Sequence, residues 1–468
     1  MSVQKKFASS SLFLFLDSIV LGVAGWIYWL VMTKFASSSE IGQATTIYSL
    51  IVLVDTLTQL SLEYPLLKKS SIQRSRVLGA ALTIELAITL SVLPFIVLLL
   101  NYLYDENLLK YTWIVIVMVP LLGINFVSHF ALLGVSNSKT ILVLDTVATG
   151  IRLGIGYVLV AQLGYGSLGI LLSFLIQALF IGGTTLFFSL QTFGIKFGDL
   201  KVIKETVKDG LANMPSKLSR TLIFSLSVVL LAYFGVRASE VGQFYIALLI
   251  TVFVGSLVSS MAYMVIPASS ISKRDLTSGS LRMGISVTSP MIAALLTSPT
   301  FILSLLGNQY LSAETILIVL AIAIFPLTIV TNAISKFNFS GNSKKLVLLG
   351  TIQLLVFLIF FFLLVPYAGT VGAALSILIA YSATSITAIL WLDRILIKYI
   401  LVSGIAIFIG YCAGKTLEVF LVGTGTAISN ILPLIIALCV TLCIVMILKN
   451  ISISEIRELV RISVGKKQ

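Results

Sequence analysis

Long, continuously apolar segments make up most of the chain, and polar residues are concentrated in the short stretches between them. A run of ~20 apolar residues crosses a bilayer as an α-helix, whereas a membrane β-strand has ~10 residues of alternating character. The pattern therefore predicts an all-α polytopic membrane protein with about fourteen transmembrane helices. These are expected near residues 11–33, 41–62, 77–103, 112–134, 140–162, 167–190, 211–235, 241–267, 281–306, 315–335, 346–366, 369–392, 399–421 and 427–448.

The composition agrees with this pattern. Of the 468 residues, 58% are hydrophobic and only 10% are charged, and the mean hydropathy is +1.10. Soluble domains carry a larger charged fraction, because charged side chains keep their surfaces in water. The chain is therefore predicted to be an integral membrane protein.

Residue types that enzymes use for metal binding and nucleophilic catalysis are scarce. His129 is the single histidine, and Cys412, Cys439 and Cys443 all lie in the last two apolar segments. The sequence GYCAGKT at 410–416 is one residue short of a phosphate-binding loop and lies inside an apolar segment, so we interpret it as coincidental. The outward loops are too short to form a domain with catalytic acids. We expect no enzymatic activity, metal or cofactor, with Na⁺ or H⁺ as the candidate coupling ion.

The distribution of Lys and Arg predicts the orientation in the membrane. With a cytoplasmic N-terminus, all but five of the 31 basic residues fall in inner segments. The exceptions are Lys34, Lys110, Arg237 and Lys415 in outer loops and Arg152 within a helix. Because basic residues beside membrane helices collect on the cytoplasmic side, we expect a plasma-membrane protein with both termini in the cytoplasm. The net charge of +13 then reflects topology and contact with anionic membrane lipid, and not binding of nucleic acid.

Three sequence fragments recur in the same order. The pairs are SEIGQ at 39–43 with SEVGQ at 239–243, NSK at 137–139 with NSK at 342–344, and GSLGILLSFLI from Gly166 with GTVGAALSILI from Gly369. Their similar spacings indicate a duplication of a six-helix block. Because six is even, both blocks enter the membrane from the same side, so the repeats are parallel. Two further helices follow the second block.

This duplication predicts the domain organisation. The expected parts are an N-lobe at 1–194, a cytoplasmic interfacial linker at 195–210, a C-lobe at 211–398, helices 13 and 14 at 399–450 and a cytoplasmic amphipathic tail at 451–468. In the linker, Leu200, Ile203 and Val207 share one face of a helix, as in helices that lie on a membrane surface. We expect the linker and the tail to be surface anchors, and contact of either with a partner remains an alternative.

Ionisable residues within the membrane segments are concentrated in the first lobe. Asp17, Asp55, Glu85 and Asp145 lie at similar depths on the cytoplasmic side, and Arg152 lies on the same helical face as Asp145. Each such charge costs ~2.5–3.5 kcal/mol on insertion scales, so each calls for a reason. One interpretation is a Na⁺ or H⁺ site that couples transport to an ion gradient. The alternative is that Arg152 pairs with one acid and the other acids are neutral and hydrogen-bonded.

Basic residues take the corresponding place in the second lobe. Lys217 and Arg220 lie three residues apart on one face of the seventh helix. With Arg152 they form a candidate binding site for the phosphate or pyrophosphate of a substrate headgroup. The alternative is an ordinary snorkelling pair at a cytoplasmic helix end.

Several fragments in order and over essentially the whole chain resemble the polysaccharide flippases of the MATE-like multidrug/oligosaccharidyl-lipid/polysaccharide exporter superfamily. They are SSEIGQATTIYSL from Ser38, VKDGLANMPSKLSRTLI from Val207, SEVGQFYIALLI from Ser239, MVIPASSIS from Met264 and GTVGAALSILIAYSATSI from Gly369. The resemblance implies a two-lobed fold that alternates between inward-open and outward-open states. Asp17 and Asp145 look like the first-lobe cation site of the related drug antiporters.

The resemblance also implies a function. The expected substrate is an isoprenoid-linked oligosaccharide, flipped from the cytoplasmic to the outer leaflet for surface polysaccharide, cell-wall or glycoprotein synthesis. Expected partners are membrane lipid, this substrate, and glycosyltransferases or a polymerase of the same pathway. A Na⁺/H⁺-coupled exporter of drugs or metabolites on the same fold is one alternative. A non-transporting scaffold for glycosyltransferases is another.

Overall fold

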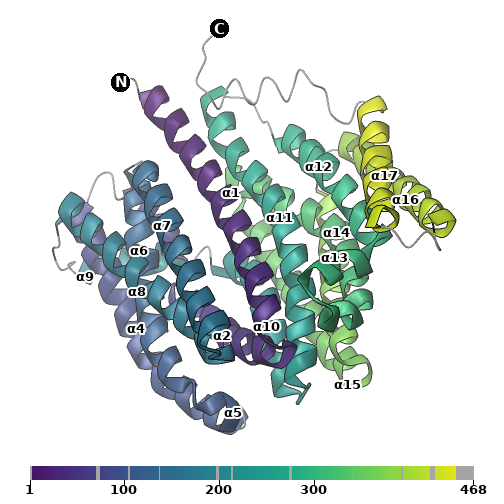
Figure 1. The fold of residues 1–468 in the computed structure, drawn as a ribbon. Helices are drawn as coiled ribbons and strands as arrows, with labels where there is room; N and C mark the ends of the chain where they lie inside the picture. The colour runs from purple at the N-terminus through teal and green to yellow at the C-terminus, as the bar shows by residue number, and fades with distance from the viewer. Residues whose placement is uncertain are drawn as a thin grey trace. The chain divides into compact units, whose positions relative to one another are not determined.

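The computed structural model describes residues 3–69, 74–103, 106–135, 137–194, 196, 200–211, 214–272, 277–340, 342–391, 394–421 and 427–448. Within these ranges the chain forms helices and short turns, without a β-strand (Figure 1). The helices up to the middle of the chain are α1 (Val3–Phe35), α2 (Ser38–Thr58), α3 (Glu63–Lys69), α4 (Arg74–Leu103), α5 (Glu106–Leu109), α6 (Thr112–Gly134), α7 (Ser138–Tyr157), η1 (Val158–Gln162), α8 (Gly166–Phe193) and α9 (Leu200–Leu211). They are followed by α10 (Met214–Tyr233), α11 (Ala238–Ser272), α12 (Thr277–Thr297), α13 (Pro299–Leu306), η2 (Asn308–Ala313), α14 (Glu314–Phe339), α15 (Ser343–Ile389), α16 (Arg394–Leu421) and α17 (Ala427–Ile447). The predicted tail at 451–468 lies outside the described residues.

The helices match the predicted membrane segments. Within the described residues, ten helices are long and apolar enough to cross a membrane, or eleven if the bent pair α12 and α13 counts as one span. α15 contains two of the predicted segments, joined at a kink where Gly369 has a φ of +52°. The apolar parts described for α10 and α17 are shorter, at Ile223–Tyr233 and Ile431–Ile447. Each predicted segment thus corresponds to a helix or to part of a bent one, which confirms the all-α membrane fold.

The described chain packs as two compact units. One comprises residues 13–242, and the other comprises residues 1–12 and 243–468. α11 therefore begins in the first unit and continues in the second. The predicted domain boundaries at 194, 210 and 398 are drawn from the sequence repeat. They are a different division from these two packing units, so they remain a prediction.

Glycines occupy equivalent positions in the two repeats. Gly166 at the start of α8 and Gly369 within α15 both have positive φ, +47° and +52°. Three residues later, Gly169 and Gly372 each face the preceding helix, where an added Cβ would approach backbone atoms to 3.2 Å and 2.6 Å respectively. Glycine adopts positive φ without steric cost and permits this close approach. The two copies of this fragment therefore form the same tight helical turn, as a duplication predicts.

The two copies of the S-E-x-G-Q fragment touch each other within the first unit. Gly42 on α2 faces the first turn of α11, where an added Cβ would overlap the carbonyl group of Ala238. A Cβ on Gly242 would likewise overlap the carbonyl oxygen of Ser38. Small residues let membrane helices approach until their backbones touch. The repeated glycine is thus explained by a close crossing of α2 and α11.

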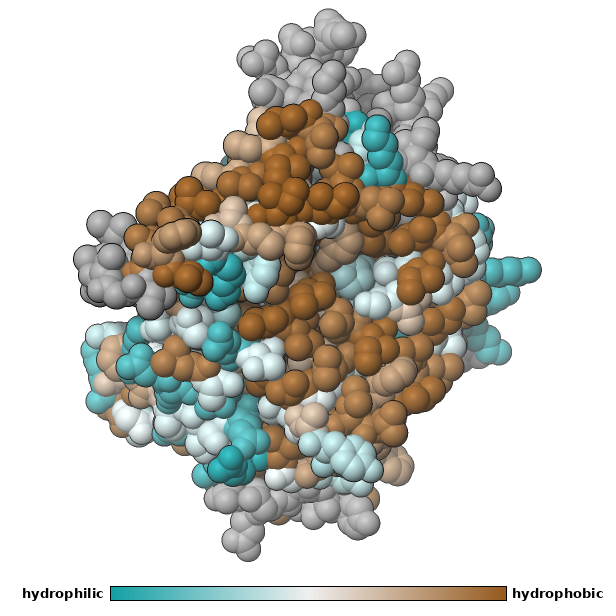
Figure 2. Space-filling view, turned by 90° about the vertical axis from the view of Figure 1, so that its right-hand side faces the viewer, coloured by the Kyte–Doolittle hydropathy of each residue, from teal (hydrophilic) through white to brown (hydrophobic). Residues whose placement is uncertain are grey.

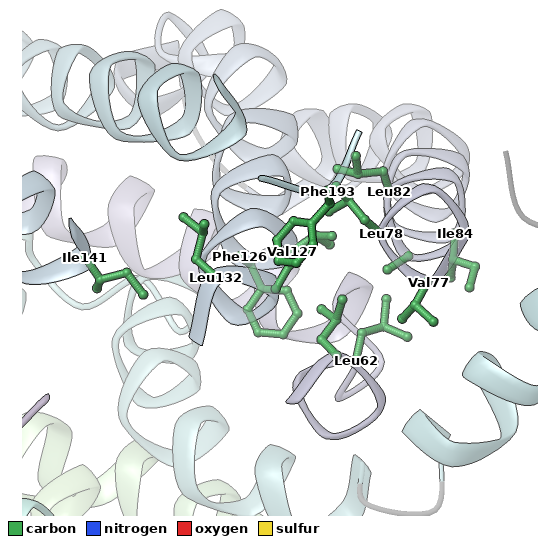
Figure 3. Packing of buried hydrophobic residues seen from close by; sticks show 13 residues of the cluster. Leu62, Val77, Leu78, Leu82, Ile84, Phe126, Val127, Leu132, Ile141 and Phe193 are labelled. Atoms are coloured by element: carbon green, nitrogen blue, oxygen red, sulfur yellow. The ribbon is translucent and has the colours of Figure 1, made fainter. Parts of the chain in front are cut away.

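A hydrophobic cluster holds one end of the first unit together. Its buried members are Leu62, Leu66, Val77, Leu78, Ala81, Leu82, Ile84, Phe126, Val127, Ala131, Leu132, Ile141 and Phe193. Figure 3 shows Leu78 and Phe193 meeting beside Val127. The amphipathic helix α9 packs Val202, Ile203 and Val207 against this cluster. The apolar face of the predicted linker helix therefore packs against the protein itself and is partly buried there.

The span predicted over 281–306 is broken. α12 and α13 meet at an angle of 84°, at Ser298, whose φ of −131° and ψ of 56° are not helical. Pro299 begins α13 and has no amide hydrogen with which to continue the helical ladder. The predicted segment is therefore present as two helices, because the backbone turns at the proline.

The fragment GYCAGKT lies within α16 and has a packing role. A Cβ on Gly410 would overlap the side chain of Thr441 on α17, and one on Gly414 would lie 2.5 Å from Thr297 on α12. Two glycines four residues apart form a smooth helix face of the kind that membrane helices use for close contact.

Figure 2 views the molecule from the side of α16 and α17 and shows broad hydrophobic areas, as expected for lipid-facing helices.

Candidate functional site

Two of the predicted membrane acids meet inside the first unit. Asp17 on α1 and Asp145 on α7 are 6% and 8% exposed, and their carboxyl groups lie close enough to interact directly. Two carboxylates offer only acceptors, so a hydrogen bond between them would require a proton on one of the groups. Nδ1 of His129 on α6 lies 3.9 Å from Oδ2 of Asp145. These three side chains form a cluster that can hold and exchange a proton.

The other two predicted acids have separate partners. The side-chain amide of Gln59 donates to Asp55, one turn earlier on α2, at 2.6 Å. Glu85 on α4 is fully buried and accepts hydrogen bonds from Thr58 at 3.0 Å and from Thr89 at 3.3 Å. In the described chain no group of three His, Cys, Asp or Glu side chains is arranged to hold a metal ion. Of the four acids, the structure thus joins the first and the last directly.

Arg152 lies two turns along α7 from Asp145, and the described residues provide it with no carboxylate partner. Its guanidinium carbon lies 4.7 Å from the centre of the Tyr28 ring and 5.0 Å from the centre of the Phe174 ring. Nη1 donates to Oε1 of Gln177 at 3.3 Å. Nε is shielded from solvent and makes no hydrogen bond. The alternative in which Arg152 pairs with an acid is therefore not formed here.

Aromatic and small side chains from α1, α2, α7 and α8 build the surroundings of this arginine. The hydroxyl groups of Tyr28 and Ser173 are 2.7 Å apart, and Tyr48 stacks on Phe174 with ring centres 4.1 Å apart. Gly156, one turn further along α7, leaves room for Tyr28, whose ring would lie 2.8 Å from an added Cβ. These residues could not be predicted from the sequence, because aromatic residues are common in membrane proteins and the contacting positions are as much as 145 residues apart.

The contacts of Arg152 leave part of its charge and hydrogen-bonding capacity unused. A guanidinium in a membrane helix costs ~2.5–3.5 kcal/mol on insertion scales, and a cation–π contact returns ~0.5–2 kcal/mol. A buried donor without an acceptor costs a further ~1–3 kcal/mol. An oxyanion would neutralise the charge and accept from the free N–H groups. The other two predicted headgroup residues, Lys217 and Arg220, belong to α10, and their side chains lie outside the described residues.

Solved structures show the same fold. A structure titled lipid II flippase MurJ, in an inward closed conformation, matches with a TM-score of 0.75 and 16% identity over 96% of this chain and 100% of that chain. An inward-facing MATE-family multidrug resistance transporter matches with a TM-score of 0.54 and 17% identity over 85% and 96% of the two chains. The Vibrio cholerae MATE transporter VcmN matches with a TM-score of 0.53 and 14% identity over 83% and 95%.

A comparison with sequence families gives the same assignment. No curated protein sequence matches the chain. A family model described as polysaccharide biosynthesis protein matches residues 31–315, which is more than half of the chain. This match and the fold confirm the predicted resemblance to polysaccharide flippases of the MATE-like superfamily. The chain belongs to the polysaccharide biosynthesis protein family and has the fold shared by MurJ and the MATE transporters.

Proposed function

We propose that the protein is a flippase that moves isoprenoid-linked oligosaccharide from the cytoplasmic to the outer leaflet, for surface polysaccharide, cell-wall or glycoprotein synthesis. The observation that carries this proposal is Arg152, a cation at membrane depth that the described residues leave without a carboxylate. The diphosphate between lipid and sugar brings the negative charge that such a site lacks. The family description and the fold shared with a lipid II flippase support the same substrate class.

We assign the location, the other basic residues and the partners of the protein on the same basis. The protein is a transporter and not an enzyme, and it resides in the plasma membrane with both termini in the cytoplasm. Lys217 and Arg220 extend the phosphate site from the second repeat. Lipid-linked oligosaccharide and membrane lipid are its direct ligands, and glycosyltransferases or a polymerase of the same pathway supply or consume the substrate.

We further propose that the buried acids couple transport to an ion. The adjacent pair of Asp17 and Asp145 is the best candidate, because two neighbouring acids can share a proton and release it when the groups separate. Asp55 on α2 and Glu85 on α4 belong to the same lobe, and we assign them as further polar positions of the ion site. We propose H⁺ over Na⁺ at the pair, since two adjacent acids can share a proton, and the described residues form no group of three His, Cys, Asp or Glu side chains that could hold a metal ion.

A cation-coupled exporter of drugs or metabolites is the second candidate. The cluster of Asp17, Asp145 and His129 favours it, because such a site serves any substrate whose export is driven by protons. The unpaired Arg152 favours an anionic substrate and hence the flippase. A scaffold that does not transport would have no use for either group of membrane charges.

The test is a flipping assay on the full chain in lipid vesicles. A fluorescent prenyl-diphosphate disaccharide is incorporated in both leaflets, and a membrane-impermeant quencher measures how fast the inner label reaches the outside. We expect rapid exchange with the native chain and little with Arg152→Gln. A native chain that leaves the labelled lipid in place, yet expels a cationic dye under a proton gradient, would establish the exporter instead.

A further inference from the structure

We propose that Tyr28 and Phe174 are positioning residues for Arg152, which they hold so that its Nε and Nη2 edge receives two oxygens of the substrate diphosphate. This inference rests on the proposed function and names the residues that orient the arginine. The guanidinium carbon lies in the corner between the two rings, 4.7 Å from one centre and 5.0 Å from the other. The planes of these rings are inclined by 65°. Contact with two inclined faces fixes both the place and the plane of the guanidinium.

The hydrogen bonds of Arg152 indicate which edge receives the ligand. Nη1 is already engaged by Gln177 at 3.3 Å. Nε makes no hydrogen bond, and no hydrogen bond joins Nη2 to the described residues. Together, Nε and Nη2 form the side-on fork with which arginine binds two oxygens of one phosphate. The unused donors are thus adjacent and parallel.

The two rings are held by their own packing and do not need a ligand to stay in place. Tyr28 is fully buried, its hydroxyl is 2.7 Å from that of Ser173, and Gly156 lets it lie against α7. Phe174 is 3% exposed and stacked against Tyr48. A binding group whose neighbours are fixed in advance loses little freedom when the ligand arrives.

The side of the fork next to α1 is the more open one at Nη2, whereas Nε is shielded from solvent and must be uncovered when the ligand binds. Gly25 lies one turn before Tyr28, and a Cβ there would be 4.0 Å from Nη2 of Arg152 with no other atom within 4 Å. A larger side chain at this position would occupy the space beside the proposed fork. Gly25→Leu should therefore block the ligand while leaving Arg152 and both rings in place.

Binding is measured with Trp29 as a built-in probe. Its ring lies 5.4 Å from Tyr28 and 6.2 Å from Phe174. The full chain, with Trp26, Trp113 and Trp391 replaced by Phe, is titrated in nanodiscs with pyrophosphate and with farnesyl diphosphate. Farnesyl monophosphate and palmitate are the comparison anions. We expect quenching by both diphosphates, and at least about tenfold weaker binding for Arg152→Gln and Gly25→Leu.

The positioning role is tested by a comparison of ring and hydroxyl. Tyr28→Phe keeps the ring and should bind the diphosphates almost as well as the native chain. Tyr28→Leu and Phe174→Leu remove a ring face and should weaken binding by about tenfold. Phe187→Leu is the matched control, because Phe187 also lies on α8 but is 61% exposed. Elution as a single folded species is required of each variant, and Tyr28→Leu alone carries the test if Phe174→Leu does not fold.

A double-mutant cycle separates positioning from general packing. Lysine is a point charge that gains little from a fixed plane, so Tyr28→Leu should add almost nothing to the loss caused by Arg152→Lys. Losses that simply multiply would show that Tyr28 acts through packing alone, and the inference would be wrong. Efficient flipping by Arg152→Gln would also overturn it and would remove Arg152 as support for the proposed function, although flipping by the native chain would still show a flippase. Diphosphate binding by a chain that flips no lipid would instead retain the site and overturn the flippase proposal.

Discussion

Charged side chains at membrane depth in the first unit are compensated in different ways. Asp17 and Asp145 lie next to each other and can share a proton, while Glu85 accepts from two threonine hydroxyl groups. Arg152 is surrounded by rings and a glutamine. An acid pair that shares a proton responds to pH, whereas an arginine keeps its charge at all accessible pH values. The proton site and the anion site therefore require different tests.

Replacing one acid of the pair should abolish coupling without altering shape. In Asp17→Asn or Asp145→Asn the amide donates to the remaining carboxylate, so the contact persists without a shared proton. Transport by these variants should lose its dependence on a pH or Na⁺ gradient. Flux is measured in vesicles with and without an imposed gradient, with Glu205→Gln on the exposed face of α9 as the control. Gradient-dependent flux in both variants would show that the pair is only structural.

The basic residues of α10 should contribute to binding of the headgroup. A charge-assisted contact is worth ~1.5–3 kcal/mol, so Lys217→Ala or Arg220→Ala should weaken binding of a diphosphate lipid by about ten- to a hundredfold. Expression should stay normal, as with the control Lys201→Ala on α9. Arg220→Lys should restore little if the arginine binds two oxygens, and much if charge alone matters. Full flipping by the double alanine variant would show that both residues only set topology.

The turn after α2, at Leu60 and Ser61, is the corner at which the helix that carries Asp55 meets the linker helix α9. Leu60 and Ser61 have φ values of 43° and 55°, the only non-glycine residues with positive φ in the described chain. Such conformations cost ~1–3 kcal/mol each and persist only where surrounding structure imposes them. Gly210 near the end of α9 lies against this corner, since an added Cβ would be 2.5 Å from the carbonyl oxygen of Leu60. The packing of α9 thus holds the strained turn in place.

Gly210→Ala should therefore displace α9 and destabilise the first unit. Because the neighbouring atom is backbone, the helix itself must shift, at a cost of ~1–3 kcal/mol. Thermal denaturation of the purified chain in detergent should show a lower Tm. Gly183→Ala is the matched control, since a Cβ on Gly183 in α8 has no atom within 4 Å, and alanine there should be neutral or stabilising. Equal Tm values for the two variants would mean that α9 is not packed tightly against the turn at Leu60 and Ser61.

Across the whole molecule, the sequence predicted what depends on local pattern and missed what depends on packing. The segment predicted at 112–134 coincides with α6, because its apolar run is bounded by polar residues. The break at Ser298 was missed, since a proline in a membrane helix is compatible with a gentle bend or a sharp turn. The depths of Asp145 and Arg152 followed from helix geometry, but their neighbours come from distant segments. Periodicity within one helix cannot indicate which helix packs against it.

Orientation in the membrane remains a prediction, and three consecutive spans offer a sharp test of it. Lys110 follows α5 and Lys201 lies on α9, and Figure 1 shows α5 and α9 at opposite ends of the first unit. Between them the chain passes through α6, α7 with η1, and α8. An odd number of crossings places the two positions on opposite sides of the bilayer.

Single cysteines at these positions, in a chain whose Cys412, Cys439 and Cys443 are replaced by serine, are treated with a membrane-impermeant maleimide. In intact cells Lys110→Cys should be labelled, whereas Lys201→Cys should react only after permeabilisation. Labelling of both from outside would mean that one of the three helices does not cross. The reverse pattern would place the basic segments outside, against the charge distribution. It would also place Asp17 and Asp145 toward the outer face of the membrane.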